Sequence, residues 1–357
     1  MSERSVGTID SFRWVCAAIT PLAVTHQPQP GSPAMSPDWE DIMHVASEHL
    51  VVPNLYVGLR IKGLLTEVPA DFCETLEAFQ CLNTLRNGRL RRQMLEISST
   101  LNAIGVTPIW LKGANNLMAV DWQKSGRMML DLDFWVPDPT QRTDALKCLD
   151  QLGYFVPSEY SQVNFDASQH VAPRFRDGEL ARIEVHQCIV DPKVAQLLPD
   201  REALTRAEWI HWEGHRVGRL SLPDRLMHSY IQCTEMSGDT MFRARISLRK
   251  VLDFVQLALA CGDAFHSRAF TEKLEQPPWC LRSRQFLSYV EHDFGLVSPL
   301  VPDSTYLFRR RLNRQFPRLM YGRLFLHRFH CIFREGRIGS PLRWRQRLSN
   351  FLSNYSQ

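Results

Sequence analysis

WLKGANNLMAVDWQKSGRMMLDLDFWV, residues 110–136, is the most informative segment of this 357-residue chain. It places Asp131 and Asp133 inside an apolar run, Met128 to Val136, which predicts a β-strand. Residues two apart on a strand project from the same face, about 6.6–6.8 Å apart along the chain. Two carboxylates that are buried together raise each other's pKa. A divalent cation is therefore the expected compensation.

A glycine turn precedes this strand. Lys112 lies at the end of a short apolar segment, where its ammonium group can meet phosphate charge. Gly113 is expected to adopt a backbone conformation that other residues resist. A glycine turn followed by an Asp-x-Asp strand suggests an enzyme that handles nucleotide phosphates through Mg²⁺.

A third acid fits this pattern. Residues 180–186 alternate as a half-buried strand does, with Ile183 and Val185 toward a core. Glu184 and His186 then share the opposite face. Glu184 is predicted to complete a three-carboxylate metal site with the two aspartates.

Each of these residues also has a purely structural interpretation. The two aspartates can belong to a solvated strand face, and Glu184 can be an exposed glutamate paired with Arg182 or Arg174. His186 can contact phosphate or acceptor, or it can be a buried histidine bonded to the backbone.

Composition excludes several other classes of protein. The chain is 44% hydrophobic and 22% charged, and no apolar run reaches the roughly 18–20 residues of a membrane span. Nine scattered cysteines without a C-x-x-C pair argue against zinc and redox motifs. Without a signal pattern at the N-terminus, the chain is expected to be cytoplasmic.

The C-terminal tail carries most of the excess positive charge. Residues 303–348 are rich in arginine with interleaved aromatic residues. One interpretation is nucleic-acid contact, where arginine meets phosphate and aromatics stack on bases. Others are an anionic membrane surface, an acidic partner, or a packed helical domain. The spacing of Phe325, Phe329 and Phe333 by four favours the packed helix.

Periodicity and turn residues divide the chain. Ser36-Pro37-Asp38 predicts a helix start, Asp177-Gly178 a hairpin turn, and Pro223-Asp224 another helix start. The predicted regions are an irregular N-terminal arm (1–35), an N-terminal helical region (36–104), a mixed β-α core (105–191), a C-terminal helical region (192–300) and an arginine- and aromatic-rich extension (301–357).

The core is predicted to hold short strands and helices in alternation. Its expected strands are residues 106–111, 128–136, and a hairpin of 169–176 with 180–188; its expected helices are residues 114–120 and 140–152.

The order of these motifs resembles the nucleotidyltransferase superfamily with the DNA polymerase β-type catalytic fold. Its signature is a glycine turn, an Asp-x-Asp strand and a distant single acid on a later strand. More narrowly, the chain is similar over about residues 40–260 to a bacterial family of uncharacterised nucleotidyltransferases. The motifs that carry this resemblance are Leu111-Lys112-Gly113, Arg127 with Asp131-Leu132-Asp133, and Glu184-Val185-His186.

The resemblance implies an α+β fold: a polymerase β-like core with a mixed sheet, flanked by N-terminal and C-terminal helical regions. One departure is that Gly113 precedes Ala114, where the superfamily usually has a second glycine or a serine. Phosphate binding is therefore expected from the backbone N–H groups after Gly113, from Lys112 and from Arg127. Arg127 is expected to reach the γ-phosphate or to orient the acids.

The resemblance also implies a reaction. Asp131, Asp133 and Glu184 are expected to bind two Mg²⁺ ions, with Mn²⁺ as a substitute. NMP would pass from an NTP, first of all ATP, to an acceptor hydroxyl or phosphate, releasing pyrophosphate. Glu184 would ligate metal or accept the proton of the attacking group. The acceptor is open among a small molecule, a peptide or protein, and RNA.

Three rival functions stay open on the sequence. Attack at the γ-phosphate would make the protein a phosphotransferase with the same carboxylates. A catalytically silent nucleotide-binding or antitoxin-like protein would keep the fold without turnover. A nucleic-acid-binding protein acting through residues 303–348 would not need the carboxylates.

Overall fold

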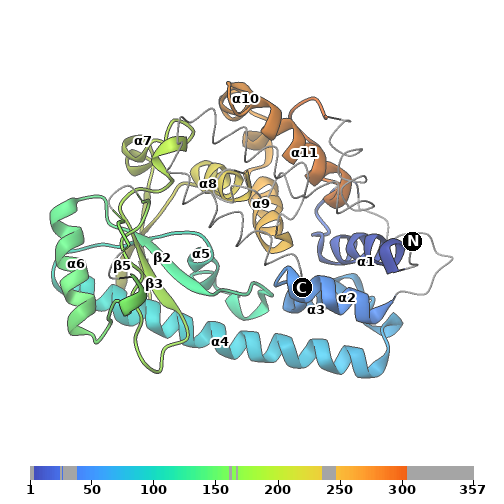
Figure 1. The fold of residues 1–357 in the computed structure, drawn as a ribbon, viewed down its shortest axis with the longest axis horizontal. Helices are drawn as coiled ribbons and strands as arrows, with labels where there is room; N and C mark the ends of the chain where they lie inside the picture. The colour runs from blue at the N-terminus through green and yellow to red at the C-terminus, as the bar shows by residue number, and fades with distance from the viewer. Residues whose placement is uncertain are drawn as a thin grey trace, which may run out of the picture.

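The computed structural model describes residues 4–24, 26, 38–160, 163–165, 168–234 and 247–303. The described part is an α+β fold with one five-stranded sheet and helices around it (Figure 1). The strand order is β3-β2-β1-β5-β4. The strands are β1 (Ile109–Trp110), β2 (Asp131–Trp135), β3 (Arg182–His186), β4 (Glu208–Trp212) and β5 (His215–Arg219).

The sheet is mixed. β1 pairs antiparallel with β2 and parallel with β5, β2 pairs parallel with β3, and β4 pairs antiparallel with β5. In the β2–β3 ladder, Asp133 lies opposite Glu184 and Asp131 opposite Arg182. Because side chains opposite each other share a face, this register brings the predicted acids together.

The helices surround this sheet on both sides. In Figure 1 the long α4 runs beneath both the sheet and α1 to α3, while α8, α9 and α11 lie on the other side of the molecule. The helices are α1 (Arg4–Ile19), α2 (Trp39–Glu48), α3 (Val52–Lys62), α4 (Ala70–Ala103), α5 (Ala114–Leu117), α6 (Pro139–Gln151), α7 (Asp200–Thr205), α8 (Leu222–Thr234), α9 (Leu248–Cys261), α10 (Arg268–Glu275) and α11 (Cys280–Phe294).

Two apolar clusters hold the fold together, and α4 contributes to both. Leu76 belongs to the cluster formed with the flanking helices, whereas Leu90 and Met94 belong to the cluster on one face of the sheet. Within the cluster on the sheet, Trp110 of β1 packs edge-on against Phe134, with 5.2 Å between the ring centres. Since both rings are fully buried, this contact fixes β1 against β2.

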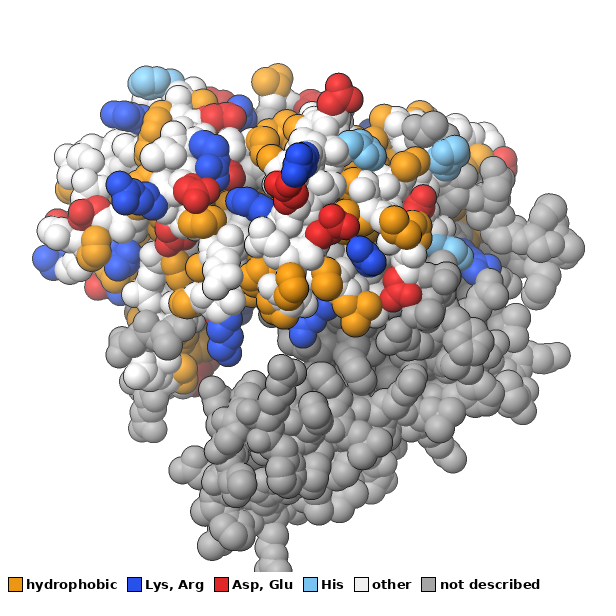
Figure 2. Space-filling view, turned by 90° about the horizontal axis from the view of Figure 1, so that it is seen from above, with side chains coloured by type: hydrophobic (Ala, Val, Ile, Leu, Met, Phe, Trp, Pro, Cys, Tyr) orange, Lys and Arg blue, Asp and Glu red, His pale blue; other side chains and the backbone are white. Residues whose placement is uncertain are grey.

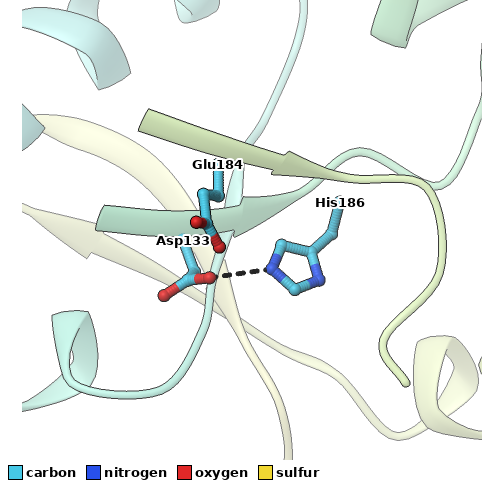
Figure 3. Close-up of side chains that lie close together, drawn as sticks. All are labelled: Asp133, Glu184 and His186. Atoms are coloured by element: carbon cyan, nitrogen blue, oxygen red, sulfur yellow. Dashed lines mark hydrogen bonds and ion pairs between the residues drawn. The ribbon is translucent and has the colours of Figure 1, made fainter. Parts of the chain in front are cut away.

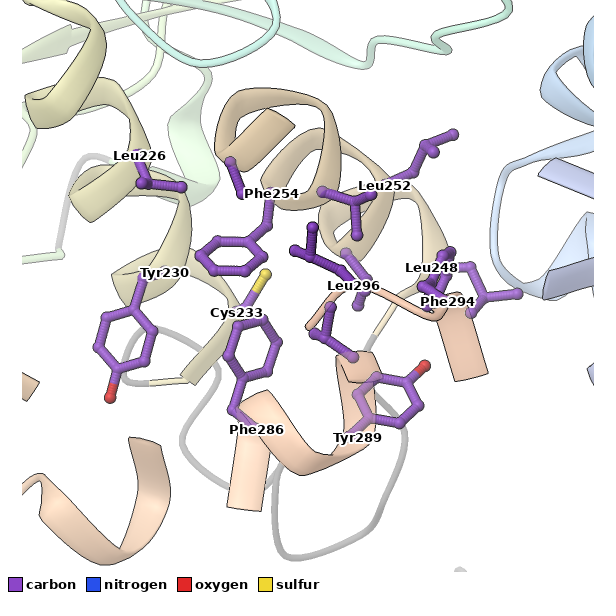
Figure 4. Packing of buried hydrophobic residues seen from close by; sticks show 14 of the residues in the cluster. Leu226, Tyr230, Cys233, Leu248, Leu252, Phe254, Phe286, Tyr289, Phe294 and Leu296 are labelled. Atoms are coloured by element: carbon purple, nitrogen blue, oxygen red, sulfur yellow. The ribbon is translucent and has the colours of Figure 1, made fainter. Parts of the chain in front are cut away.

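The C-terminal helices pack through aromatic side chains (Figure 4). The Phe254 ring of α9 lies 4.9 Å from the Phe286 ring of α11. Tyr230 of α8 is fully buried, and its hydroxyl lies 2.7 Å from the Ser283 hydroxyl. This packing buries the apolar faces of α8 and α9. Thus α8, α9 and α11 pack against one another.

Several expected boundaries are confirmed. α6 ends just before Gly153, whose φ of 85° suits a helix C-terminus. α9 ends at Cys261, with Gly262 as its C-cap. The Asp177-Gly178 turn has Gly178 at φ 81°. The predicted extension beyond residue 303 lies outside the described residues.

The N-terminal expectations need correction. Residues 1–35 were expected to form an irregular arm, but Arg4–Ile19 form α1. This helix buries Val15 and Cys16 against α2, α3 and α11. The next helix begins at Trp39 with Asp38, rather than Ser36, as its N-cap: the Asp38 carboxylate accepts from the Asp41 amide at 3.0 Å.

The sheet also differs from the sequence expectation. Residues 192–300 were expected to be helical, but β4 and β5 form a hairpin that completes the sheet beside β1. The first half of the expected 169–188 hairpin is not a continuous strand; His170 and Arg174 form only isolated antiparallel bridges to β3. The expected helix over 114–120 is the single turn α5.

The surface has mixed charge. On the face seen in Figure 2, lysine and arginine side chains are interspersed with aspartate and glutamate over the described part. This agrees with the small formal net charge of +4. Among the described helices, none combines the length and the apolar character that a bilayer crossing requires.

Candidate functional site

Asp133 lies at the centre of the acidic cluster. It projects from the middle of β2, and its side chain is 2% exposed. One carboxylate oxygen, Oδ1, accepts from Lys112 Nζ at 2.5 Å and lies 2.8 Å from His186 Nε2 (Figure 3). Both contacts reach Asp133 from elements adjacent to β2, the turn after β1 and strand β3.

Opposing effects set the charge of this cluster. Burial alone would raise the pKa of Asp133, but the Lys112 ammonium and His186 hold the pKa of that carboxyl well below its usual range. Burial would likewise lower the pKa of Lys112, and the Asp133 charge more than reverses this. Asp133 and Lys112 therefore form a buried ion pair.

Glu184 lies beside Asp133 on the adjacent strand. Its side chain is 8% exposed, and burial, followed by the Asp133 charge, raises its pKa. Arg182 Nη2 lies 2.9 Å from Glu184 Oε1 and 3.4 Å from Asp131 Oδ2. The pairing with Arg182 that a structural interpretation predicted is thus present, but Glu184 is buried rather than exposed.

The geometry of the cluster fits a divalent cation. Asp133, Glu184 and His186 each offer one ligand atom, and these atoms lie within 4.8 Å of one another. Carboxylate oxygens suit Mg²⁺ and Mn²⁺, whereas an imidazole nitrogen suits transition metals. His186 Nδ1 lies 3.2 Å from the Cys188 carbonyl oxygen. This contact holds the imidazole ring with Nε2 toward Asp133.

Asp131 belongs to the same face but has a different environment. Its side chain is 31% exposed, against 2% for Asp133, and it lines a cavity. The close group of possible ligands includes His186 in its place. The sequence had left His186 open between a phosphate or acceptor contact and a buried histidine bonded to the backbone, so its position against Asp133 is a further finding.

The glycine turn differs from its expected conformation. Gly113 has φ −62°, an ordinary helical value, while the left-handed conformation belongs to Lys112, at φ 48°. A glycine is needed at 113 for a different reason: a Cβ atom there would lie 2.9 Å from Met129 Cγ and 3.3 Å from Arg127 Cζ. Gly113 therefore permits close packing rather than an unusual φ.

The backbone amides after Gly113 are already paired. The N–H groups of Ala114, Asn115 and Asn116 donate to the carbonyls of Leu111, Lys112 and Gly113, at 3.2, 3.3 and 3.0 Å. Each of these amides therefore donates within the turn, and phosphate binding by them stays a prediction.

Arg127 forms a link between the sheet region and α9. Its Nε lies 2.7 and 2.9 Å from the two carboxylate oxygens of Asp253, and its Nη1 donates to the Met128 carbonyl. Asp253 of α9 is thus the ion-pair partner of Arg127. The Arg127 side chain nevertheless lines the same cavity as Asp131.

This cavity lies between the glycine turn and helices α8 and α9, and its volume is about 470 Å³. Such a volume falls in the range of small-molecule sites. Its lining includes Lys112, Gly113, Arg127 and Asp131, which the sequence predicted. The further polar and charged residues that line it are Asn115, Asn116, Arg225, His228, Ser229, Gln232, Arg249, Lys250, Asp253 and Gln256.

The comparison with known proteins agrees with this geometry. A family model described as uncharacterised nucleotidyltransferase matches residues 35–295. The chain belongs to this family. No curated protein and no solved structure matches it.

Membership in the uncharacterised nucleotidyltransferase family supports a transferase and implies a nucleotide substrate. The match includes every predicted site residue and also α8 and α9. It extends beyond the sheet and includes the helical wall of the cavity. The match therefore spans more of the chain than the predicted core of residues 105–191.

Sequence reasoning missed the residues of this helical wall. Arg249, Asp253 and Gln256 recur at intervals of four and three along α9, and Arg225, Ser229 and Gln232 do so along α8. Such spacing puts polar side chains on one face of a helix. A polar stripe along each of two otherwise apolar helices was the signal that could have found them.

Proposed function

We propose that the protein is a metal-dependent nucleotidyltransferase that moves NMP from an NTP to an acceptor hydroxyl or phosphate and releases pyrophosphate. The observation that carries this proposal is the buried cluster of Asp133, Glu184 and His186, next to Asp131 at a cavity with cationic lining. Clustered buried acids are costly without a positive partner. Membership in the nucleotidyltransferase family is the reason to take a nucleotide as the substrate.

The carboxylates of Asp131, Asp133 and Glu184 would hold Mg²⁺, with Mn²⁺ as a substitute and His186 as a further ligand. When bound, the ion would neutralise phosphate charge and orient the reacting oxygens. The buried acids beside the cavity then receive the α-phosphate end of the donor. ATP is the first NTP to test.

The chain's own cations would position the donor. Lys112 and Arg127 line the cavity beside Asp131, so they can orient the polyphosphate chain of an NTP. Charge placed in advance around the reacting phosphate stabilises the transition state without reorganisation. Glu184, whose pKa is raised by burial, can accept a proton from the attacking hydroxyl.

The test separates transfer of the two ends of the triphosphate. The protein is incubated with Mg²⁺ and each NTP, labelled at either the α- or the γ-phosphate, together with host cell extract as the source of acceptor. Transfer of α-label to a product, lost in Asp133→Asn but kept in the exposed control Asp263→Asn, is expected. Transfer of γ-label alone would identify a phosphotransferase instead.

A binding protein without turnover is the remaining rival. It would bind NTP with neither label transferred, and Asp133→Asn would leave that state unchanged. Equilibrium binding of each NTP, measured beside the transfer assay, separates this outcome from a misfolded protein.

A further inference from the structure

Two arginines of the helical wall carry charge that no described carboxylate pairs with. Arg225 of α8 and Arg249 of α9 both line the cavity, and neither forms an ion pair within the part of the chain that the structure describes. Arg249 donates through Nη1 to the Met128 carbonyl at 2.9 Å, but its Nε is buried without a hydrogen-bond partner. Donor capacity is therefore available at this wall.

The predicted phosphate-binding cations, Lys112 and Arg127, each already have a carboxylate partner. Lys112 bonds to Asp133, and Arg127 bonds to both oxygens of Asp253. The amides of the glycine turn also donate within the turn. The arginines of the cavity that have no described carboxylate partner thus lie on the wall formed by α8 and α9.

Burial makes these two arginines costly to the protein. It lowers the pKa of Arg225 and lowers the pKa of Arg249 to about 10. A desolvated charge without a partner opposes folding. Residues of this kind in a cavity mark a functional site, because a ligand can supply the missing charge.

We propose that Arg225 and Arg249 form a phosphate-binding subsite in the wall of the cavity. Two guanidinium groups present forked donors that match phosphate oxygens. Ser229, one turn after Arg225 on α8, lines the same wall and adds a hydroxyl donor. The phosphate comes from the donor's polyphosphate chain or from the acceptor, and this choice of sources rests on the proposed nucleotidyl transfer.

The test measures phosphate binding without turnover. Isothermal titration calorimetry with inorganic tripolyphosphate compares the wild-type protein with Arg225→Met, Arg249→Met and Arg201→Met, the last at an exposed α7 arginine outside the cavity lining. Each cavity variant is expected to weaken binding by about tenfold or more, since a charge-assisted hydrogen bond is lost. The control stays within about twofold. Equal affinity in all four proteins would overturn the subsite.

A second titration identifies the source of the phosphate. Two ligands are titrated separately into each protein: AMP, and the α,β-methylene analogue of ATP. Inorganic phosphate is then titrated into protein that is saturated with the ATP analogue. If the subsite holds the polyphosphate of the NTP donor, Arg249→Met is expected to weaken binding of the ATP analogue more than binding of AMP. If the subsite holds a phosphate of the acceptor, Arg249→Met is expected to weaken only the binding of the added inorganic phosphate. Loss of AMP and analogue binding to the same degree would contradict both sources.

The melting temperature separates binding from structure. Arg249→Met removes a desolvated charge, and the Met128 carbonyl keeps its bond from Arg127, so the variant is expected to melt no lower than the control. Arg249→Lys keeps the charge but loses the fork, and it should bind tripolyphosphate with intermediate affinity. If Arg249→Met melts lower while tripolyphosphate binding by Arg249→Lys equals wild type, Arg249 is structural and the subsite is refuted.

The two proposals fail separately. Loss of tripolyphosphate affinity in the cavity variants without any label transfer would leave the subsite and remove the nucleotidyl transfer. Transfer of α-label, with tripolyphosphate affinity unchanged in the cavity variants, would support nucleotidyl transfer and refute the subsite.

Discussion

Lys112 and Asp133 depend on each other for charge balance in a buried place. Their bond of 2.5 Å joins a carboxylate that is 2% exposed to an ammonium that is 20% exposed. Loss of either partner leaves the other with uncompensated charge, so the effect of one substitution on stability depends on the second residue.

A double-mutant cycle on this pair separates stability from activity. Asp133→Asn is expected to lower the free energy of unfolding by roughly 3 kcal/mol, because the Lys112 ammonium loses its carboxylate. Adding Lys112→Met should restore much of this stability in urea unfolding. Activity should stay on the order of 100-fold or more below wild type in both, since the acid is absent. Equal stability of the single and double variants would refute the coupling.

His228 gives the cavity wall a pH dependence. It is 3% exposed, and burial first, then the Lys112 and His186 charges, lower its pKa to about 3 against the opposing Asp133. Gln232 Nε2 lies 3.3 Å from His228 Nε2 and donates to it. The folded-state pKa is below the unfolded value, so the unfolded state binds the proton first as the pH falls.

The stabilisation by neutral His228 is complete above about pH 6.5 and decreases as the pH falls toward 3, by up to about 1.4 kcal/mol per pH unit. His228→Gln should show a shallower loss of unfolding free energy between pH 6.5 and 5. Urea unfolding at several pH values measures this, with His266→Gln at an exposed histidine as control. Parallel curves for wild type and His228→Gln would contradict the assignment.

Single residues were predictable where local pattern determines their position. Asp131, Asp133 and Glu184 follow from strand alternation, and the β2–β3 register does bring Asp133 opposite Glu184. Whether these residues bind metal stays a prediction. The reason for Gly113 was not predictable, because the atoms that exclude a Cβ belong to Met129 and Arg127. The position of Arg249 in the cavity was not predictable either, since it depends on how α9 packs against the rest of the molecule.

At the scale of elements, Gly126 allows the segment before β2 to lie close against the backbone of α3. A Cβ atom there would lie 2.6 Å from the Asn54 backbone nitrogen and 2.8 Å from the Pro53 carbonyl carbon. Neither backbone atom can move as a side chain does. The close approach therefore also fixes the neighbouring Arg127.

Gly126→Ala is expected to lower the free energy of unfolding by about 2 kcal/mol, because it overpacks a backbone contact. It should also weaken NTP binding through displacement of Arg127. The control Gly178→Ala, in an open turn at φ 81°, should lose about 1 kcal/mol from backbone strain and bind NTP as wild type. Equal NTP affinities for both variants would refute the link to Arg127.

Helices were predicted better than strands, for a local reason. α6 and α9 have caps and apolar faces within their own sequence. The β4–β5 hairpin turns through Glu213 and Gly214, with φ 48° and 83°, instead of the Asn-Gly or Asp-Gly pair that marks such turns. β1 has only two residues, so its pairing with β5 is determined by distant residues.

At the scale of the whole molecule, the sheet cannot be separated from its surroundings. β1 lies between β2 and β5, and the cluster on one face includes Leu90 and Met94 of α4. A fragment of residues 105–191 lacks both β5 and α4. The general class, a mixed sheet with flanking helices, followed from the order of motifs, whereas this interdependence did not.

The fragment of residues 105–191 is therefore expected to show no cooperative thermal unfolding by circular dichroism, whereas the full chain does. Without β5 and α4 it leaves a sheet edge unpaired and apolar surface exposed. A cooperative transition in the fragment would show that the core folds alone.

The pairing of β1 with β5 also bears on synthesis by the ribosome. Ile109 leaves the ribosome about a hundred residues before its partner Gly218. Throughout that interval one edge of β1 has no strand to pair with, and an unpaired edge invites association with other chains. Nascent chains that pause before residue 219 should therefore depend most on chaperones, and synonymous changes that alter speed in that interval should change the yield of folded protein.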